Sequence, residues 1–389
     1  MTGGSGHSRT MTVETANGST SARAAGSGPL SLRREFFTEQ APLLAAVLGL
    51  AFAAAYWQHG VLPGGDVAFP LAGVRVPIWH LIWMGFWTGY TMAVVGEAAG
   101  IFALPYSMSI LQFANPHVTP TTQLLTFLNP FGALFGFRRN RQWNLDLALW
   151  VCLGGVVGGL TGPFIRITLL SDVKPFTFAV GLALVFAGAH LCHAAVHGFR
   201  ARTSGAGLEG RFHRAARERR AQGLSPDGLP ADMAIRTTAR GGGWITVEFW
   251  GEVWRINQAL MFVTGAGVGV ISAALGVGGG FLLVPIFAAI YGLPIYVLVA
   301  ATIPYVIVLS AVGLFTYGVI LPAVLGTTLA PEWAWGLFAA AGGIFGAWCA
   351  AKTQRYVPEH SLKLMLGGVT GIAGLLYVAG FFFELPFKL

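Results

Sequence analysis

Apolar runs long enough to cross a lipid bilayer recur along most of this chain, and they restrict it to one broad class of fold. A membrane span needs about 20 predominantly apolar residues. Seven runs of about that length are predicted to cross, at roughly 41–58, 118–137, 145–165, 175–198, 295–318, 332–351 and 362–383. Only 10% of the residues are charged, whereas about 25% is usual in soluble domains. The sequence therefore predicts an all-α polytopic membrane protein and excludes an ordinary cytosolic enzyme.

The segments outside these runs differ in composition. Residues 1–40 are rich in Gly, Ser and Thr and are predicted to be a disordered cytoplasmic tail rather than a signal peptide, and an extra transmembrane helix follows at 41–60. The loop 199–243 carries nine Arg against four acidic residues. It is predicted to be a solvated cytoplasmic linker, with binding to anionic lipid headgroups as the alternative. The segment 244–256 contains several Trp and Phe residues and predicts an interfacial aromatic helix.

Basic residues orient the chain, because Lys and Arg favour the cytoplasmic side of a membrane. We place the N-terminus in the cytoplasm and let the glycine-interrupted stretches 77–113 and 257–291 each enter and leave on one side. Of the 24 basic residues, 20 then lie on the cytoplasmic side. Asp146 and Arg166 bracket one span and are predicted to face lipid headgroups. The chain is thus predicted to be a multi-pass protein of the inner (cytoplasmic) membrane, with no basic cluster left for nucleic acid.

Motifs for cofactors or covalent catalysis are absent from the sequence. There is no phosphate loop, nucleophile elbow or metalloprotease motif, and three scattered cysteines cannot form a zinc or disulfide framework. His190, His193 and His197 share one helical face beside Cys192, a spacing that could ligate a metal or serve a membrane-embedded enzyme. Because they lie at the end of a span without a carboxylate, we predict interfacial histidines, no metal and no cofactor.

A segment of the first half recurs in the second half at a constant offset of 180 residues, so that 85–137 aligns on 265–317 without a gap. The matched pairs include Gly85 and Gly265, Gly89 and Gly269, Gly96 and Gly276, Gly100 and Gly280, Pro105 and Pro285, and Thr122 and Thr302. A basic cluster at 138–141 follows the first copy, whereas the matching segment 318–321 is uncharged. The sequence therefore predicts two inverted-topology repeats, 77–198 and 257–385, each a Gly-broken helical hairpin plus three transmembrane helices.

The glycine-rich segments are predicted to break the two interrupted stretches. As one straight helix, 77–113 would be about 55 Å long, far beyond a hydrocarbon core of about 30 Å. Glycine permits the backbone angles of a break, and Pro285 fits best in the first turn of a helix. Half-helices are thus predicted to start near Phe281 and Ile101, with their positive dipole ends near the bilayer middle. Two such ends would form an anion cradle.

Close helix packing is the alternative for these glycines, because small residues spaced four apart let membrane helices approach. We favour packing for Gly85, Gly89, Gly265 and Gly269, and the broken-helix site for the denser run 276–280. The predicted substrate-binding residues are Gly96, Gly100, Thr122, Gln123, Thr126, Asn129, Gly276, Gly278, Gly279, Gly280 and Thr302.

Polar side chains within the spans need partners in the membrane. Thr122, Thr126 and Asn129 lie at i, i+4 and i+7 on one helical face, where either an oxyanion or a neighbouring helix would supply those partners. Glu97 is the one carboxylate well inside an apolar stretch, at the first break. It is predicted as a candidate for proton coupling, with a helix cap or a position at an aqueous mouth as alternatives.

At these residues the chain resembles the TauE/SafE (sulfite exporter) permease family. The resemblance is carried by Gly276-Val277-Gly278-Gly279-Gly280-Phe281-Leu282-Leu283-Val284-Pro285, Tyr291-Gly292-Leu293-Pro294 and Ala300-Ala301-Thr302. It covers roughly 80–198 and 257–385, but Gly96-Glu97-Ala98-Ala99-Gly100 replaces the family's glycine-rich run in the first half. The resemblance implies transport of sulfite, an organosulfonate or a related sulfur oxyanion, whereas the residues alone indicate only a small anion.

The sequence thus predicts a secondary anion transporter that works by alternating access. An anion channel with a similar pore is the first alternative, and a membrane-embedded enzyme using the three histidines is the second. The expected partners are a small sulfur anion and membrane lipid. The anion itself, the direction of transport, the coupling ion and homo-oligomerisation are left open.

Overall fold

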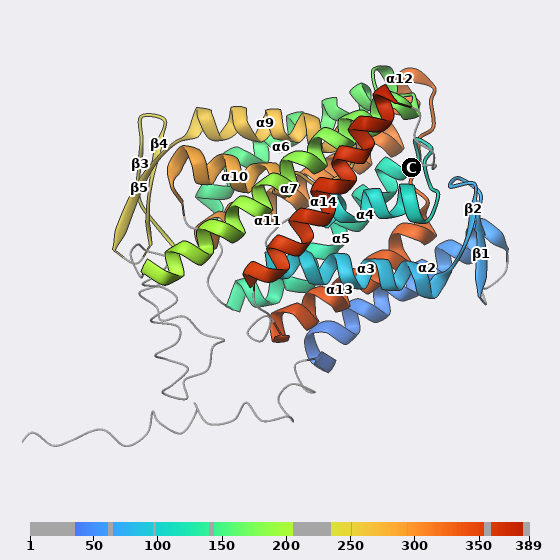
Figure 1. Cartoon of the computed structure of the whole chain (residues 1–389), viewed down its shortest axis with the longest axis horizontal. Helices are drawn as coiled ribbons and strands as arrows, with labels where there is room; N and C mark the ends of the chain where they lie inside the picture. The colour runs from blue at the N-terminus through green and yellow to red at the C-terminus, as the bar shows by residue number, and fades with distance from the viewer. Residues whose placement is uncertain are drawn as a thin grey trace, which may run out of the picture.

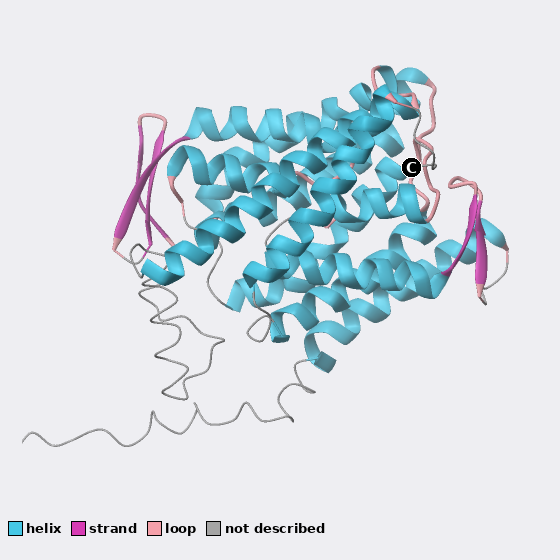
Figure 2. Ribbon diagram, in the orientation of Figure 1, coloured by secondary structure: helices cyan, strands magenta, loops and turns pink. Residues whose placement is uncertain are grey.

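The computed structural model describes residues 36–60, 65–95, 99–139, 144–204, 235–249, 251–293, 295–353 and 359–383. These residues are mostly helical, with two small antiparallel sheets at opposite ends of the helical body (Figures 1 and 2). The predicted all-α class is therefore correct for the helical body and wrong in omitting the strands. Most of the predicted tail lies outside the described residues, but its last five form a π-helix, Phe36–Gln40.

The first half of the chain contains α2 (Ala41–His59), β1 (Asp66–Phe69), β2 (Val74–Pro77), α3 (Ile78–Val95), α4 (Gly100–Pro105), the π-helix η3 (Tyr106–Ile110), α5 (Val118–Arg139), α6 (Leu145–Thr168) and α7 (Val173–Ser204). The second half contains β3 (Arg236–Gly241), β4 (Trp244–Phe249), β5 (Glu252–Asn257), α9 (Gln258–Leu275), α10 (Gly280–Tyr291), α11 (Ile295–Phe315), η5 (Thr316–Ile320), α12 (Leu321–Leu325), α13 (Trp333–Thr353) and α14 (Glu359–Phe382).

Seven of the described helices are long and apolar enough to span a membrane, which makes this a multi-pass membrane protein. Six of them coincide with predicted spans. The seventh prediction, 118–137, corresponds to α5, whose Thr, Gln and Asn residues leave it outside this set, and α9 qualifies instead. Gly100–Ile110 and Gly280–Tyr291 are shorter apolar helices, as expected for the two half-helices.

The two halves repeat the same order of elements. The bounds of α9 each lie 180 residues after those of α3, and Gly280, which opens α10, lies 180 residues after Gly100, which opens α4. The packing is also reciprocal: α3 packs on α13 while α9 packs on α6, and α5 packs on α13 while α11 packs on α6. The last helices of the two halves, α7 and α14, pack on each other.

Small residues allow these long contacts. The Cα of Gly85 lies against the backbone of Ala339, and that of Gly89 against Gly343. Gly265 meets Val151, and Gly269 meets Gly158. The packing interpretation of these four repeat glycines is therefore confirmed, and their role is to bring α3 onto α13 and α9 onto α6.

The segment 244–256 is a pair of strands, so the predicted interfacial helix is wrong. Side chains of β4 alternate between exposed or half-buried and buried, and Ile245, Val247 and Phe249 face the core. β4 pairs with β3 through a turn at Gly242 and Gly243, both at positive φ. β3 begins at Arg236, inside the predicted basic loop, of which 205–234 lie outside the described residues.

The close contact of α9 with α6 leads to a stability prediction. A Cβ on Gly265 would lie 2.5 Å from the Val151 carbonyl oxygen, whereas a Cβ on Gly267, on the same helix, would meet nothing within 4 Å. We expect Gly265→Leu to destabilise the protein by about 1–3 kcal/mol through overpacking. Gly267→Leu, the matched control, should change stability by about 0.5 kcal/mol or less. Denaturation of the purified variants in lipid nanodiscs would compare them, and equal stability would contradict this packing.

Candidate functional site

Three glycines in the left-handed region separate α9 from α10. Gly276 has φ 78°, Gly278 has φ 83° and Gly279 has φ 76°. Side chains with a Cβ adopt this region only at an energetic cost, so the break depends on glycine here. The predicted break within 257–291 is therefore confirmed at Gly276–Gly279.

The half-helix α10 begins at Gly280, one residue before the expected start, and its 12 residues are too few to span a bilayer. Pro285 is the sixth residue of α10, so its predicted place in the first turn is wrong. A proline there removes the amide that would otherwise donate to the Phe281 carbonyl. The glycine turn, and not the proline, sets where the helix starts.

The first turn of α10 presents unused donors. The amide N–H groups of Gly276 and Val277 donate to the Ser272 carbonyl at 2.8 and 3.1 Å. Those of the next four residues, Gly278 to Phe281, have no acceptor among the described residues, and all four residues are buried. Buried amides without a partner are rare and costly in proteins. Open amides at the positive end of a helix dipole are the kind of surface at which proteins bind anions.

The second break contacts the first. A Cβ placed on Gly100, at the start of α4, would lie 2.8 Å from Val277 Cα and 2.7 Å from Thr126 Oγ1. A Cβ on Gly276 would lie 2.8 Å from Thr122 Oγ1. Figure 1 shows α4 and α10 toward opposite sides of the helical body. The structure therefore brings Gly100, Thr122, Thr126 and Gly276 together, whereas Gly96 and Glu97 lie outside the described residues.

The two threonine hydroxyls donate within their own helix. Thr122 Oγ1 donates to the carbonyls of Val118 and Thr119, each at 3.0 Å, and Thr126 Oγ1 donates to Thr122 O at 2.8 Å. Bonding of this kind is common for Thr inside helices. In this structure the two hydroxyls therefore find their acceptors within α5, and binding of an oxyanion by Thr122 or Thr126 stays a prediction.

The other predicted polar residues lie farther along the helices. Gln123 packs on Gly313, and its Nε2 is 3.5 Å from the Leu309 carbonyl oxygen. Asn129 packs on Gly343 of α13, and neither of its side-chain polar atoms has a partner. Thr302 is buried on α11. Among the described residues, no hydrogen bond joins these three side chains to the breaks.

Ser272 belongs to the site although the sequence did not single it out. Its hydroxyl is buried without a hydrogen-bond partner and would lie 3.2 Å from a Cβ on Gly279. The ring of Tyr305 closes the other side, with Cε1 2.8 Å from that Cβ position and the hydroxyl donating to Gly265 O at 2.8 Å. The sequence offered one sign of this role: Ser272 is the one hydroxyl residue in the last two turns of α9, just before the glycine run.

Arg166 is the largest departure from expectation. It was predicted to face headgroups, yet only 1% of its surface is exposed. Nε donates to Thr119 Oγ1 at 2.9 Å, Nη1 donates to Leu170 O, and the guanidinium carbon lies 3.8 Å from the Phe176 ring centroid. The loop after α6 folds over the side chain and buries it. Asp146 at the other end of α6 stays near the surface and pairs with Arg240 at 2.5 Å.

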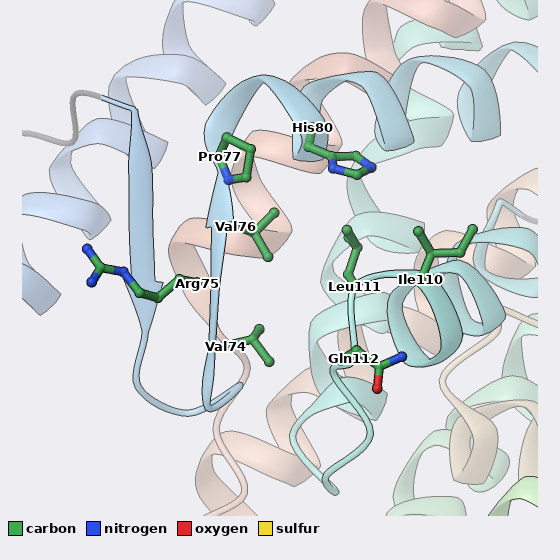
Figure 3. A pocket seen from close by; sticks show the side chains of 8 residues that line it. All are labelled: Val74, Arg75, Val76, Pro77, His80, Ile110, Leu111 and Gln112. Atoms are coloured by element: carbon green, nitrogen blue, oxygen red, sulfur yellow. The ribbon is translucent and has the colours of Figure 1, made fainter. Parts of the chain in front are cut away.

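A separate pocket of about 450 Å³ lies between β2, the start of α3 and the end of η3 (Figure 3). His80 extends over Leu111 and its Nε2 is 2.7 Å from the Tyr106 hydroxyl oxygen, whereas Arg75 points away from Gln112. None of the predicted site residues lines this pocket. Within the described part of the chain, no group of three or more His, Cys, Asp or Glu residues could hold a metal ion.

Comparison with known proteins agrees with the resemblance noted in the sequence. The family model described as Sulfite exporter TauE/SafE matches residues 81–377, which include both helix breaks. No curated protein and no solved structure matches the chain. Because the matched segment is well over half of the sequence, the chain belongs to the TauE/SafE sulfite exporter family.

Proposed function

We propose that this protein is a secondary carrier that moves a small sulfur oxyanion, such as sulfite or an organosulfonate, across the cytoplasmic membrane by alternating access. The observation that carries the proposal is the second break, where four buried amides, from Gly278 to Phe281, and the neighbouring Ser272 hydroxyl have no hydrogen-bond partner among the described residues. Family membership supports a sulfur oxyanion as the ligand. An anion placed there would give each donor an acceptor.

The energetics favour an anion over a neutral ligand at this position. A hydrogen bond to a charged group contributes about 1.5–3 kcal/mol, roughly twice the value for neutral partners. Several such bonds at a helix N-terminus are needed to offset the several kcal/mol lost when an anion leaves water. Main-chain amides supply these bonds at the second break. The described residues of the two break segments contain no carboxylate that would repel the anion. Glu97 is the one carboxylate in the sequence of the two break segments, and we propose it for proton coupling because protonatable carboxylates inside membranes often serve that role.

The architecture proposed for this carrier is a pair of inverted repeats. Reciprocal packing of α3 on α13 and of α9 on α6 supports a two-fold relation between the halves, and the basic cluster that follows only the first copy supports an axis in the membrane plane. The two breaks touch at Gly100 and Val277, so rocking of one repeat against the other would change access at this contact. We place the N-terminus and the basic loop 199–243 in the cytoplasm, and the apolar outer faces of the helices against lipid.

Flux in proteoliposomes tests the function. We expect uptake of sulfite or small sulfonates that saturates with concentration and is stimulated by the same anion on the opposite side. Sulfate and thiosulfate are the comparison anions, and runs with and without a pH gradient report proton coupling. Non-saturating flux above about 10³ per second, the usual upper range of turnover, would favour the channel alternative. Empty liposomes provide the background.

Inverted topology is tested by accessibility of paired cysteines. In a background with the three native cysteines replaced, Asn140→Cys and Ile320→Cys mark matching positions of the two repeats. We expect a membrane-impermeant maleimide to label position 140 only from the cytoplasmic side and position 320 only from the outside. Labelling of both positions from the same side would exclude inverted repeats.

Gly279→Leu tests the cradle at the break. A side chain here meets the Tyr305 ring and requires a left-handed backbone, so the variant should insert and fold but lose transport. Gly292→Leu is the matched control, because Gly292 also has positive φ, of 62°, but a Cβ there meets nothing within 4 Å. Both variants carry a similar backbone strain of about 1–3 kcal/mol. Equal flux in the two variants would remove the break from the binding site.

A further inference from the structure

Arg166 is a buried cation without a carboxylate partner among the described residues. A guanidinium has five N–H donors, and two of its nitrogens bond here, to Thr119 Oγ1 and Leu170 O. Burial of an uncompensated charge costs several kcal/mol. The carbonyl end of α6 and the Phe176 ring offset part of that cost, since both attract cations. Nη2 makes no hydrogen bond among the described residues and is the nitrogen left for an anion.

One residue links Arg166 to the second helix break. Thr119 accepts from Arg166 Nε, and its carbonyl oxygen and Cγ2 lie against Gly276, the first left-handed residue of the break. The buried Tyr317 hydroxyl donates to the carbonyl of Ala273, next to Ser272 in the sequence, at 3.2 Å. Through Thr119, Arg166 is therefore one side chain away from Gly276, which lies two residues before the first open amide.

We propose that Arg166 is a substrate-binding residue that provides the fixed positive charge for the transported anion. This proposal rests on the proposed function. A planar guanidinium pairs best with a ligand that presents two oxygens on one face. The site should therefore favour sulfite and sulfonates, which carry several oxygens on one sulfur, over a monatomic anion such as chloride. Thr119 holds the guanidinium in place and acts as a positioning residue.

The test is anion binding by the purified full-length protein in nanodiscs. Isothermal titration with methanesulfonate, at constant ionic strength, compares the wild type with Arg166→Gln, Arg166→Lys and the control Arg75→Gln. Arg75 is an exposed arginine on β2. We expect Arg166→Gln to weaken binding by about 30-fold or more, as for loss of one partner of a buried charge pair. Arg166→Lys keeps the charge but not the two-pronged contact, so we expect an intermediate loss of affinity. Arg75→Gln should bind methanesulfonate as the wild type does.

Each result separates a binding role from a structural one. If Arg166 only closes the end of α6, the Gln variant will unfold at a lower temperature while its folded fraction binds methanesulfonate as the wild type does. That outcome overturns the proposal and leaves the proposed function intact. If the Gln variant does not fold, the Lys variant carries the test: methanesulfonate affinity and preference over chloride that both equal those of the wild type would overturn the two-pronged contact on which the proposal rests. Wild-type protein that prefers chloride to methanesulfonate also overturns it, whereas wild type that binds neither anion contradicts the proposed function itself.

Discussion

The membrane interior offers no water to backbone groups, and this constraint determines how the whole structure is built. A helix that breaks inside a bilayer leaves amides that only protein or ligand can satisfy. At the second break, two amides return to the Ser272 carbonyl, and those of Gly278 to Phe281 remain open. Helices packed around that turn keep it buried. Tyr305 and Leu309 pack against Gly279 from α11, and Thr119 and Thr122 pack against Gly276 from α5.

Glycine serves two distinct purposes in this chain, and the structure separates them. Along α3 and α9, glycines in ordinary helical geometry let backbones touch, as Gly85 does with Ala339. At the break, glycines adopt left-handed geometry that creates the open donors. The first group holds α3 against α13 and α9 against α6, so each helix before a break packs on a helix of the other half. This packing places the first residues of α4 and α10 close together. Close packing is therefore the condition under which the two breaks can meet.

Much of the fold was predictable because it follows from local chemistry. The density of glycine at 276–280 located the second break, and the 180-residue offset anticipated the matching bounds of α3 and α9. The strands of 236–257 were missed because aromatic content at 244–256 dominated over the alternating pattern. Arg166 was misplaced because its burial depends on Thr119 and Phe176, which come from other helices. The direction of the Thr122 hydroxyl is likewise a tertiary property that no sequence spacing determines.

The chemical nature of the donors constrains how the proposed carrier responds to pH. Main-chain amides and a serine hydroxyl do not titrate near neutral pH, and arginine remains charged there. In a binding site made of Gly278, Gly279, Ser272 and Arg166, the donors would therefore keep the same protonation state near neutral pH. Their contribution to the affinity for the anion would not depend on pH. Protonation of the anion and protonation of Glu97 are then the two sources of pH dependence that we expect in transport. A sulfonate, which stays ionised at all pH values tested, distinguishes these two sources. Its own protonation does not change, so pH dependence of its transport would be assigned to Glu97.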